Sequence, residues 1–190
     1  MPNPASVASS YKRRHKPNMN ENAKFRQGYY TSTSGKCLTR ENIYRSSWEI
    51  GFYEWCDRTP AVVRWASEPI AVEYRNPVGN LEYCAKNRLD PNDPRNWPIA
   101  RYYTDAWIEL QGSDGRIRKI FVEIKPYCQT QRPQPVPSDA PLRQQKAFNR
   151  AARIYLQNSA KWAAAKKYFE SRGAEFMVFT EHTLEKLGIL

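Results

Sequence analysis

The sequence predicts an α/β fold in which a mixed central sheet is flanked by helices. Two observations support this class: apolar residues recur at helical spacing after residue 40, and two later runs alternate apolar and polar side chains as paired strands do. The predicted elements then follow the order helix, strands, helices, strand and short helix. This order is typical of helices packed on a sheet.

The first predicted helix begins near Arg40, with Thr39 as its N-cap, because hydroxyl side chains accept hydrogen bonds from the N–H groups at a helix start. Thr59 and Pro60 end this helix, since proline disfavours helical geometry in the residue before it. The helical spacing comes from the apolar positions Ile43, Tyr44, Trp48, Phe52 and Trp55.

Strands and loops follow the first helix. β-Branched and aromatic residues mark the strands, whereas Pro, Asn, Asp and Gly mark the connections. The predicted elements are, in order, strands at 61–65 and 70–74, a short returning strand at 81–84, a loop insertion at 85–98, and a hairpin of strands 102–110 and 117–125.

The last third of the chain is predicted to hold two long helices, a strand and a short helix. Residues 128–141 are rich in Gln and Pro and form a second loop insertion. Asn158 or Ser159 is expected to cap the second helix, and Gly173 to end it. The elements are a helix at 141–156, a helix between residue 159 and Gly173, a strand at 176–180 and a short helix at 183–187.

The formal net charge is +11, and most of it lies near the start of the chain. Residues 1–40 hold eight Lys and Arg against Glu21 alone, a balance of +7. We interpret residues 1–38 as a basic arm that binds a polyanion, most often nucleic acid, and residues 39–190 as the domain. The alternative is a solvated terminus. The candidate phosphate-contacting residues are Lys12, Arg13, Arg14, Lys16, Lys161 and Lys166.

Several protein classes are disfavoured. No apolar run has the length of a membrane span, and the first residues lack the apolar core of a secretory signal, so we expect a soluble cytoplasmic protein. The cysteines form no CxxC pair and only two histidines could join them, which argues against a zinc site. Free thiols are the expected state of Cys37, Cys56, Cys84 and Cys128.

The predicted hairpin separates its residues by parity. Its even positions are apolar on both strands, so even-numbered residues should share one face and odd-numbered residues the other. Pairing Gln111 with Ile117 over the turn satisfies this requirement. The same register places Asp105 opposite Glu123, with Cβ atoms roughly 4.5–5.5 Å apart.

Two carboxylates at that separation repel unless a cation lies between them. Mg²⁺ suits this position, because it prefers carboxylate oxygens and retains water ligands. Lys125 shares the face of Glu123 and can orient a water or stabilise charge on a phosphate. The alternative is a solvated face with an ordinary Glu-x-Lys sequence, but Trp107 and Phe121 on the same face favour a covered site.

Glu49 on the first predicted helix is a further candidate, because a carboxylate from a packed helix could reach a second metal ion. From its spacing alone, an ordinary surface residue is the better interpretation. Glu68 and Gln129 are weaker candidates.

Asp105 followed by Glu123-Ile124-Lys125, after a helix and two strands, resembles the PD-(D/E)xK nuclease superfamily. Over residues 40–188 the wider pattern is similar to two groups, the N-terminal domain of the endonuclease subunit of heteromeric transposases and the head-completion nucleases of contractile-tailed phages. The segments that carry this resemblance include Ser46–Glu49, Val63–Ile70, Tyr103–Asp105, Val122–Pro126 and Lys161–Ala165.

The resemblance implies a restriction-endonuclease-like core and a nuclease that uses Mg²⁺, for which Mn²⁺ can substitute. The implied roles are metal binding by Asp105, Glu123 and the backbone carbonyl of Ile124, positioning of water by Lys125, and a catalytic helix carboxylate, Glu49, that could reach a second metal. Thr104 stands where the motif has proline, and the two loop insertions and the basic arm also depart from the pattern.

Three functions are therefore compared. The first is a phage head-completion nuclease that processes double-stranded DNA and helps join head to tail. Its partners would be portal, neck and tail proteins, with ring assembly on the connector, first in the host cytoplasm and then in the virion. The second is a structural neck protein with a vestigial nuclease site, which the arm and insertions favour. The third is a transposition or repair endonuclease.

Overall fold

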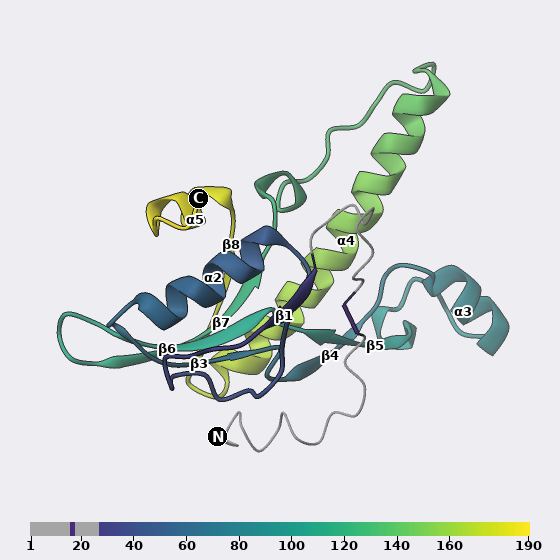
Figure 1. Ribbon diagram of the computed structural model, residues 1–190. Coiled ribbons are helices and arrows are strands. Elements are labelled where there is room, and N and C mark those ends of the chain that lie inside the picture. Colours follow the sequence, from purple (N-terminus) through teal and green to yellow (C-terminus); the bar gives the residue numbers. More distant parts are fainter. Residues whose placement is uncertain (1–15, 18–26) are drawn as a thin grey trace. The chain divides into compact units, whose positions relative to one another are not determined.

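The computed structural model of this protein describes residues 16–17 and 27–190 (Figure 1). The chain forms two compact units, and each unit is assembled from separate stretches of sequence. The first unit contains the described residues up to 71, together with 103–124 and 169–190, and the second contains 72–102 and 125–168.

The first unit is built on a four-stranded mixed sheet with the order β3-β6-β7-β8. Adjacent strands among β3 (Val62–Ser67), β6 (Ala106–Gln111) and β7 (Ile117–Ile124) are antiparallel, whereas β8 (Glu175–Phe179) lies parallel to β7. A parallel neighbour requires a long crossover between its strands, and residues 125–174 supply it. The mixed sheet that the sequence predicts is confirmed.

The register of β6 on β7 is the predicted one. Gln111 pairs with Ile117, and Ala106 pairs with Val122 at the other end of the ladder. The even face packs against α2 (Ser47–Arg58), whose Phe52, Tyr53 and Cys56 are fully buried in the same core (Figure 1). The alternation of apolar and polar residues along the two strands therefore identified the face of the hairpin that packs in the main core.

The odd face of the hairpin is covered as well. Trp107 and Phe121 are 3% and 2% exposed, and their ring centroids lie 6.4 Å apart. Phe169, at the C-terminal end of α4 (Leu142–Glu170), stacks on Phe121 with ring centroids 3.6 Å apart. The expectation of a covered rather than a solvated face is confirmed.

The predicted start of the first helix is wrong. Asn42–Tyr44 form strand β2, which pairs antiparallel with β1 (Gly28–Tyr30), and α2 begins only at Ser47. Ser46 is the N-cap, because its side chain accepts the N–H of Glu49 at 3.2 Å. Thr39 instead donates its hydroxyl to the side chain of Asn42.

The segment that precedes β2 is attached to α2 through Asp57. The hydroxyl groups of Tyr30, Ser32 and Ser34 and the indole N–H of Trp65 all donate hydrogen bonds to the Asp57 carboxylate, at 2.6–2.8 Å. Lys36 donates to the backbone carbonyls of Asp57 and Thr59. Residues 28–36, which the sequence analysis placed in the arm, are thus bonded to the core of the first unit.

The second unit differs most from the sequence-based expectation. Residues Asn80–Asn87 form helix α3, so the predicted returning strand at 81–84 is wrong, and the predicted loop at 85–98 contains the end of α3 and a 3-10 turn, η1 (Pro94–Asn96). A two-stranded sheet pairs β4 (Ala71–Arg75) with β5 (Ile99–Tyr103). The predicted strand 102–110 is therefore interrupted at residues 104–105.

The prediction of two helices after residue 141 is also wrong, because α4 is continuous. Asn158 and Ser159 lie inside it, and Asn158 is only 5% exposed. A buried side chain cannot turn outward to cap, so tertiary packing overrides its local preference. Gly173 does have the left-handed φ of 69° that ends the helix. A short turn, η2 (Tyr127–Gln129), precedes α4, and α5 (Glu181–Lys186) follows β8.

Within the part of the chain that the structure describes, no helix has both the length and the apolar composition of a membrane span.

Asp57→Ala is expected to lower the free energy of unfolding by about 2–3 kcal/mol, because hydrogen bonds to a charged acceptor contribute about 1.5–3 kcal/mol and the donors would be left without it. Urea unfolding at neutral pH measures the loss. Glu54→Ala, which removes an exposed carboxylate from the same helix, is the matched control and should change little.

This stabilisation should depend on pH. Burial, the largest single influence, raises the pKa of Asp57, but hydrogen bonds from Ser34, Trp65, Tyr30 and Ser32 together outweigh it, so the pKa lies below the usual 3.8. A group with a lowered folded-state pKa stabilises above its unfolded-state pKa and loses that contribution as pH falls through the folded value. The difference between wild type and Asp57→Ala should therefore shrink only below about pH 4; a constant difference down to pH 2 would contradict this.

Candidate active site

Glu123 is the least exposed carboxylate in the described chain, at 2%. It lies on β7, directly before Ile124, the last residue of the strand. A buried carboxylate is costly unless hydrogen bonds, an ion pair or a metal compensate for lost hydration. Glu109 illustrates the structural solution, because it is 5% exposed and accepts a 2.7 Å ion pair from Arg64 on the neighbouring strand.

Asp105 lies in the bend between β5 and β6 and approaches the same end of β7. Its Oδ2 accepts a hydrogen bond from the backbone N–H of Ile124 at 2.7 Å. The strand pairing itself ends one residue earlier, at Ala106 and Val122. The structure thus brings the Asp105 carboxylate to the backbone beside Glu123, as the predicted register requires, although Asp105 is in a bend and not in a strand.

Tyr53 shows which other charges gather near Asp105. Its hydroxyl donates to the carbonyl oxygens of Ile43 at 3.3 Å and Asp105 at 3.5 Å. Burial, and after it the negative charges of Glu49, Asp105 and Glu68, raise the pKa of Tyr53 well above its usual value, and only the charge of Arg45 acts in the opposite direction. Three carboxylates and one guanidinium therefore act on this buried hydroxyl.

Glu49 lies in the first turn of α2 and takes part in its cap. Its Oε1 accepts the Ser46 hydroxyl at 2.9 Å and its Oε2 accepts the Arg45 N–H at 2.9 Å. Together with the Ser46 side chain on the Glu49 N–H, this is a reciprocal capping arrangement. Glu49 therefore has a structural role that the sequence analysis did not assign, and it is held close to the other carboxylates.

Glu68, a weaker candidate in the sequence, contacts the backbone of Asp105 and the side chain of Arg45. It follows β3 and has a φ of 41°, one of two described non-glycine residues with positive φ. Its N–H donates to the Asp105 carbonyl at 3.1 Å, and its carboxylate pairs with Arg45. Such strained backbone is concentrated at functional sites. The signal in the sequence was weak, because nothing local to Ser67-Glu68-Pro69 predicts a left-handed residue.

The remaining candidates lie elsewhere. Lys125 follows Ile124 directly, is half-buried, and is the first residue of the chain's return to the second unit. In that unit Lys161 places its Nζ 5.7 Å from the centroid of the Tyr102 ring, and Lys166 is exposed. Lys16 is exposed. The candidates that lie outside the described residues are Lys12, Arg13 and Arg14.

The donor set fits a hard divalent cation that keeps part of its water shell. Among the described residues, no group of three or more His, Cys, Asp and Glu side chains is arranged to hold a metal ion. Two carboxylates, a backbone carbonyl and water are the kind of oxygen ligands that Mg²⁺ takes, whereas most zinc sites are built on Cys and His. The hydrogen bond to Asp105 Oδ2 does not prevent binding, because a carboxylate has about four acceptor positions.

Two comparisons with known proteins agree with this geometry. The model of the TnsA-like endonuclease N-terminal family matches residues 59–181, and the chain belongs to this family. The class that the fold and the acidic site define is therefore that of the PD-(D/E)xK-like nucleases, which are hydrolases. The chain is also 33% identical over 145 residues to the head completion nuclease of Enterobacteria phage T4, an alignment that covers 76% of this chain and 82% of that protein.

Glu68→Gly and Glu68→Ala should differ in stability. Both remove the carboxylate and its pair with Arg45, but only glycine adopts the left-handed backbone without strain. Glycine should therefore leave the protein more stable than alanine by about 0.5–1 kcal/mol, after its greater unfolded-state entropy is included. Denaturant unfolding of the two variants tests this, and equal stabilities would mean that residue 68 is not strained.

Proposed function

We propose that this protein is a Mg²⁺-dependent nuclease that hydrolyses phosphodiester bonds of double-stranded DNA, with Asp105, Glu123 and Lys125 at its centre. The observation that carries the proposal is the 2.7 Å hydrogen bond from the Ile124 N–H to Asp105, which holds one carboxylate beside the strand that bears a second, buried one. Membership of an endonuclease family supports the same chemistry.

Asp105, Glu123 and the carbonyl of Ile124 would hold the ion, and Mn²⁺ can take its place. Such an ion, when bound, polarises a phosphate oxygen and lowers the pKa of a coordinated water. Lys125 follows the metal-binding strand, where an ammonium group orients the attacking water and stabilises negative charge developing on the phosphate. Tyr53 and Glu68 fix the Asp105 backbone from two sides, so they position the carboxylate without touching substrate.

Glu49 is proposed as an additional catalytic carboxylate, able to reach a second metal. Its two hydrogen bonds at the start of α2 hold it in one orientation, and its charge acts on Tyr53 as that of Asp105 does. The capping bonds would then serve to preorganise the carboxylate, since a fixed group loses less entropy when it binds an ion.

For the biological role we propose phage head completion, in which the protein would process packaged DNA and act where head and tail are joined. The relative named head completion nuclease supports this, because the alignment covers most of both chains. The proposal includes portal, neck and tail proteins as partners, ring assembly on the connector, and a path from host cytoplasm to virion. Transposition or repair is the competing role, which the match to the TnsA-like family favours.

Asp105→Asn and Lys125→Gln are expected to reduce cleavage of supercoiled and linear plasmid in Mg²⁺ by about 10²–10³-fold or more, because each removes a charge that acts in the transition state. Asp114→Asn in the hairpin turn and Lys119→Gln on β7 are the matched controls, with the same chemical changes on the same hairpin, and should cleave like wild type. EDTA should abolish cutting.

If folded wild type leaves all DNA intact in Mg²⁺ and Mn²⁺, the isolated protein is not a nuclease, and a structural protein of the phage neck becomes the better assignment. If the control variants lose as much activity as Asp105→Asn does, cleavage depends on the whole hairpin and not on these residues, and the assignment of the site is wrong.

Glu49→Gln and Ser46→Ala separate catalysis from helix capping. Ser46→Ala removes the N-cap hydroxyl and should destabilise the protein by about 1 kcal/mol, while cleavage continues below its unfolding temperature. Glu49→Gln should also lose some stability, but cleavage should fall more than about tenfold where the variant is fully folded. Equal cleavage by the two variants would restrict Glu49 to the cap.

A further inference from the structure

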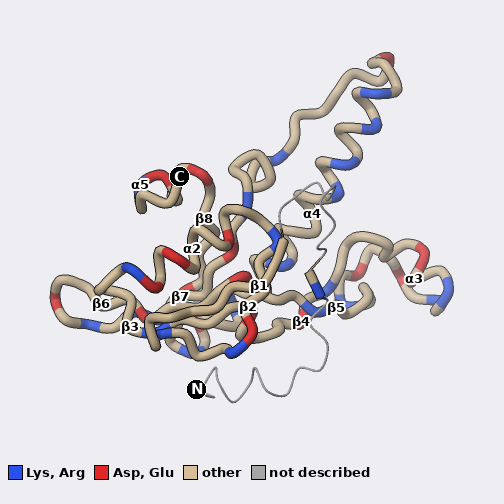
Figure 2. The backbone as a smooth tube through the Cα atoms, in the orientation of Figure 1, with Lys and Arg blue, Asp and Glu red and all other residues tan. Residues whose placement is uncertain are grey.

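The second unit carries a strongly basic surface that the proposed catalytic site does not use. Residues 72–102 and 125–168 contain fourteen Lys and Arg, of which only Lys125 belongs to the proposed site, against five Asp and Glu, a net charge of +9. Much of this charge lies on α4, and Figure 2 shows Lys and Arg repeated along the N-terminal half of that helix. No Asp or Glu occurs between Leu142 and Phe169.

Four basic residues of α4 occupy neighbouring positions around the helix: Arg143, Lys146, Arg150 and Arg153. At 100° per residue they fall within an arc of about 80°, and at 1.5 Å per residue they extend over about 15 Å. All four are exposed, and no ion pair joins any of them to another residue that the structure describes. We call these four residues the α4 basic stripe.

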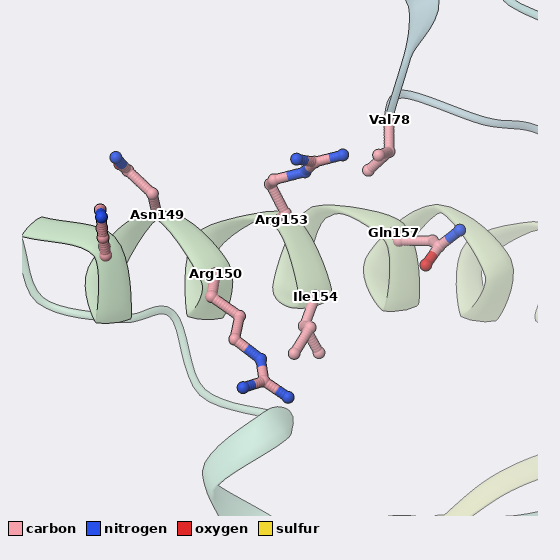
Figure 3. A pocket seen from close by; sticks show the side chains of 7 residues that line it. Val78, Asn149, Arg150, Arg153, Ile154 and Gln157 are labelled. Atoms are coloured by element: carbon pink, nitrogen blue, oxygen red, sulfur yellow. The ribbon is translucent and has the colours of Figure 1, made fainter.

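The stripe borders two grooves of the second unit. The first, about 430 Å³, is lined by Val78 and by residues of α4 that include Asn149, Arg153 and Gln157 (Figure 3). In this view Arg153 extends toward Val78, whereas Arg150 projects from another side of the helix. The second groove, about 370 Å³, lies between α4 and residues 128–133. Lys146, Arg150 and Arg153 of the stripe line the first groove, and Arg150 also lines the second.

We propose that the α4 basic stripe is a binding surface for the phosphate backbone of duplex DNA, contacted without regard to base sequence. A duplex carries about one negative charge per 1.7 Å of its axis, so a 15 Å length presents about nine phosphate charges to four cations. Asn149, which lines the first groove together with Arg153, adds a neutral donor of the kind that contacts phosphate oxygens.

This proposal extends the proposed nuclease function. It rests on that function, because a nuclease identifies the polyanion as DNA. An acidic protein surface is the competing partner, but a duplex presents regular charge over the whole length of the stripe. Contacts to the phosphate backbone would let this surface hold duplex DNA of any base sequence.

The test measures DNA binding without cleavage. A fluorescein-labelled 30-base-pair duplex is titrated in EDTA with full-length wild type, Arg150→Gln/Arg153→Gln, and the matched control Lys86→Gln/Arg88→Gln, which removes the same charge from exposed positions of α3 and its C-cap. The slope of log Kd against log salt, between about 50 and 200 mM KCl, reports the number of phosphates contacted.

Arg150→Gln/Arg153→Gln should weaken binding and reduce the magnitude of this slope by about two, whereas the control should leave the slope almost unchanged. Arg150→Lys/Arg153→Lys should keep the wild-type slope, because it retains both charges. If the salt slope falls by the same amount in Arg150→Gln/Arg153→Gln and in Lys86→Gln/Arg88→Gln, only the net charge of the protein matters, and the stripe is not the binding site. The partner is instead an acidic protein if two results are found together: polyglutamate displaces the duplex at equal charge concentration, and Arg150→Gln/Arg153→Gln loses polyglutamate binding but keeps duplex binding.

The outcome is distinguishable from failure of the proposed nuclease. Asp105→Asn, which removes no cation, should bind the duplex in EDTA with the wild-type salt slope even though its cleavage in Mg²⁺ is strongly reduced. If wild type binds DNA through the stripe but never cleaves it, the nuclease proposal is refuted and the binding surface stands. If Arg150→Gln/Arg153→Gln cleaves DNA as well as wild type at 200 mM salt, the binding surface alone is refuted.

Discussion

The antiparallel alignment of β6 with β7 determines where each charged group of the site lies. Because Gln111 pairs with Ile117, Ala106 meets Val122 and the next residue back, Asp105, reaches the N–H of Ile124. A slip of one residue would move every side chain of one strand to the opposite face. It would turn Glu123 toward α2 and expose part of the core, so the hydrophobic packing of the hairpin and the position of its carboxylates are specified by the same hydrogen bonds.

Around that hairpin, the acidic groups are held by bonds that have ordinary structural roles. Glu49 belongs to a helix cap, Glu68 pairs with Arg45, and the Asp105 carbonyl accepts from both Tyr53 and Glu68. Like charges brought together repel, so the fold must offset this cost through these contacts. A bound cation would remove much of the repulsion, and binding of an ion to the folded state alone adds to stability.

Sequence reasoning succeeded where side-chain periodicity was strong and failed where packing overrode local preference. The hairpin register followed from alternation, the covered odd face from Trp107 and Phe121, and the mixed sheet from the order of the elements. The start of α2 was not predicted correctly, because Ile43 and Tyr44 have helical spacing from Trp48 but are buried in a short strand. Asn158 resembled a cap but lies buried within α4. The contacts of Glu68 with Arg45 and Asp105 could not be predicted, because they join residues distant in sequence.

The two compact units are interleaved along the chain: the first is formed by three stretches of sequence and the second by two. The polypeptide therefore crosses from one unit to the other four times, near residues 71, 102, 124 and 168. Neither unit corresponds to a single stretch of gene, so shortening the coding sequence from either end cannot yield one of them without residues of the other. For the same reason, a protease that cuts one exposed loop would nick the molecule without releasing a complete unit.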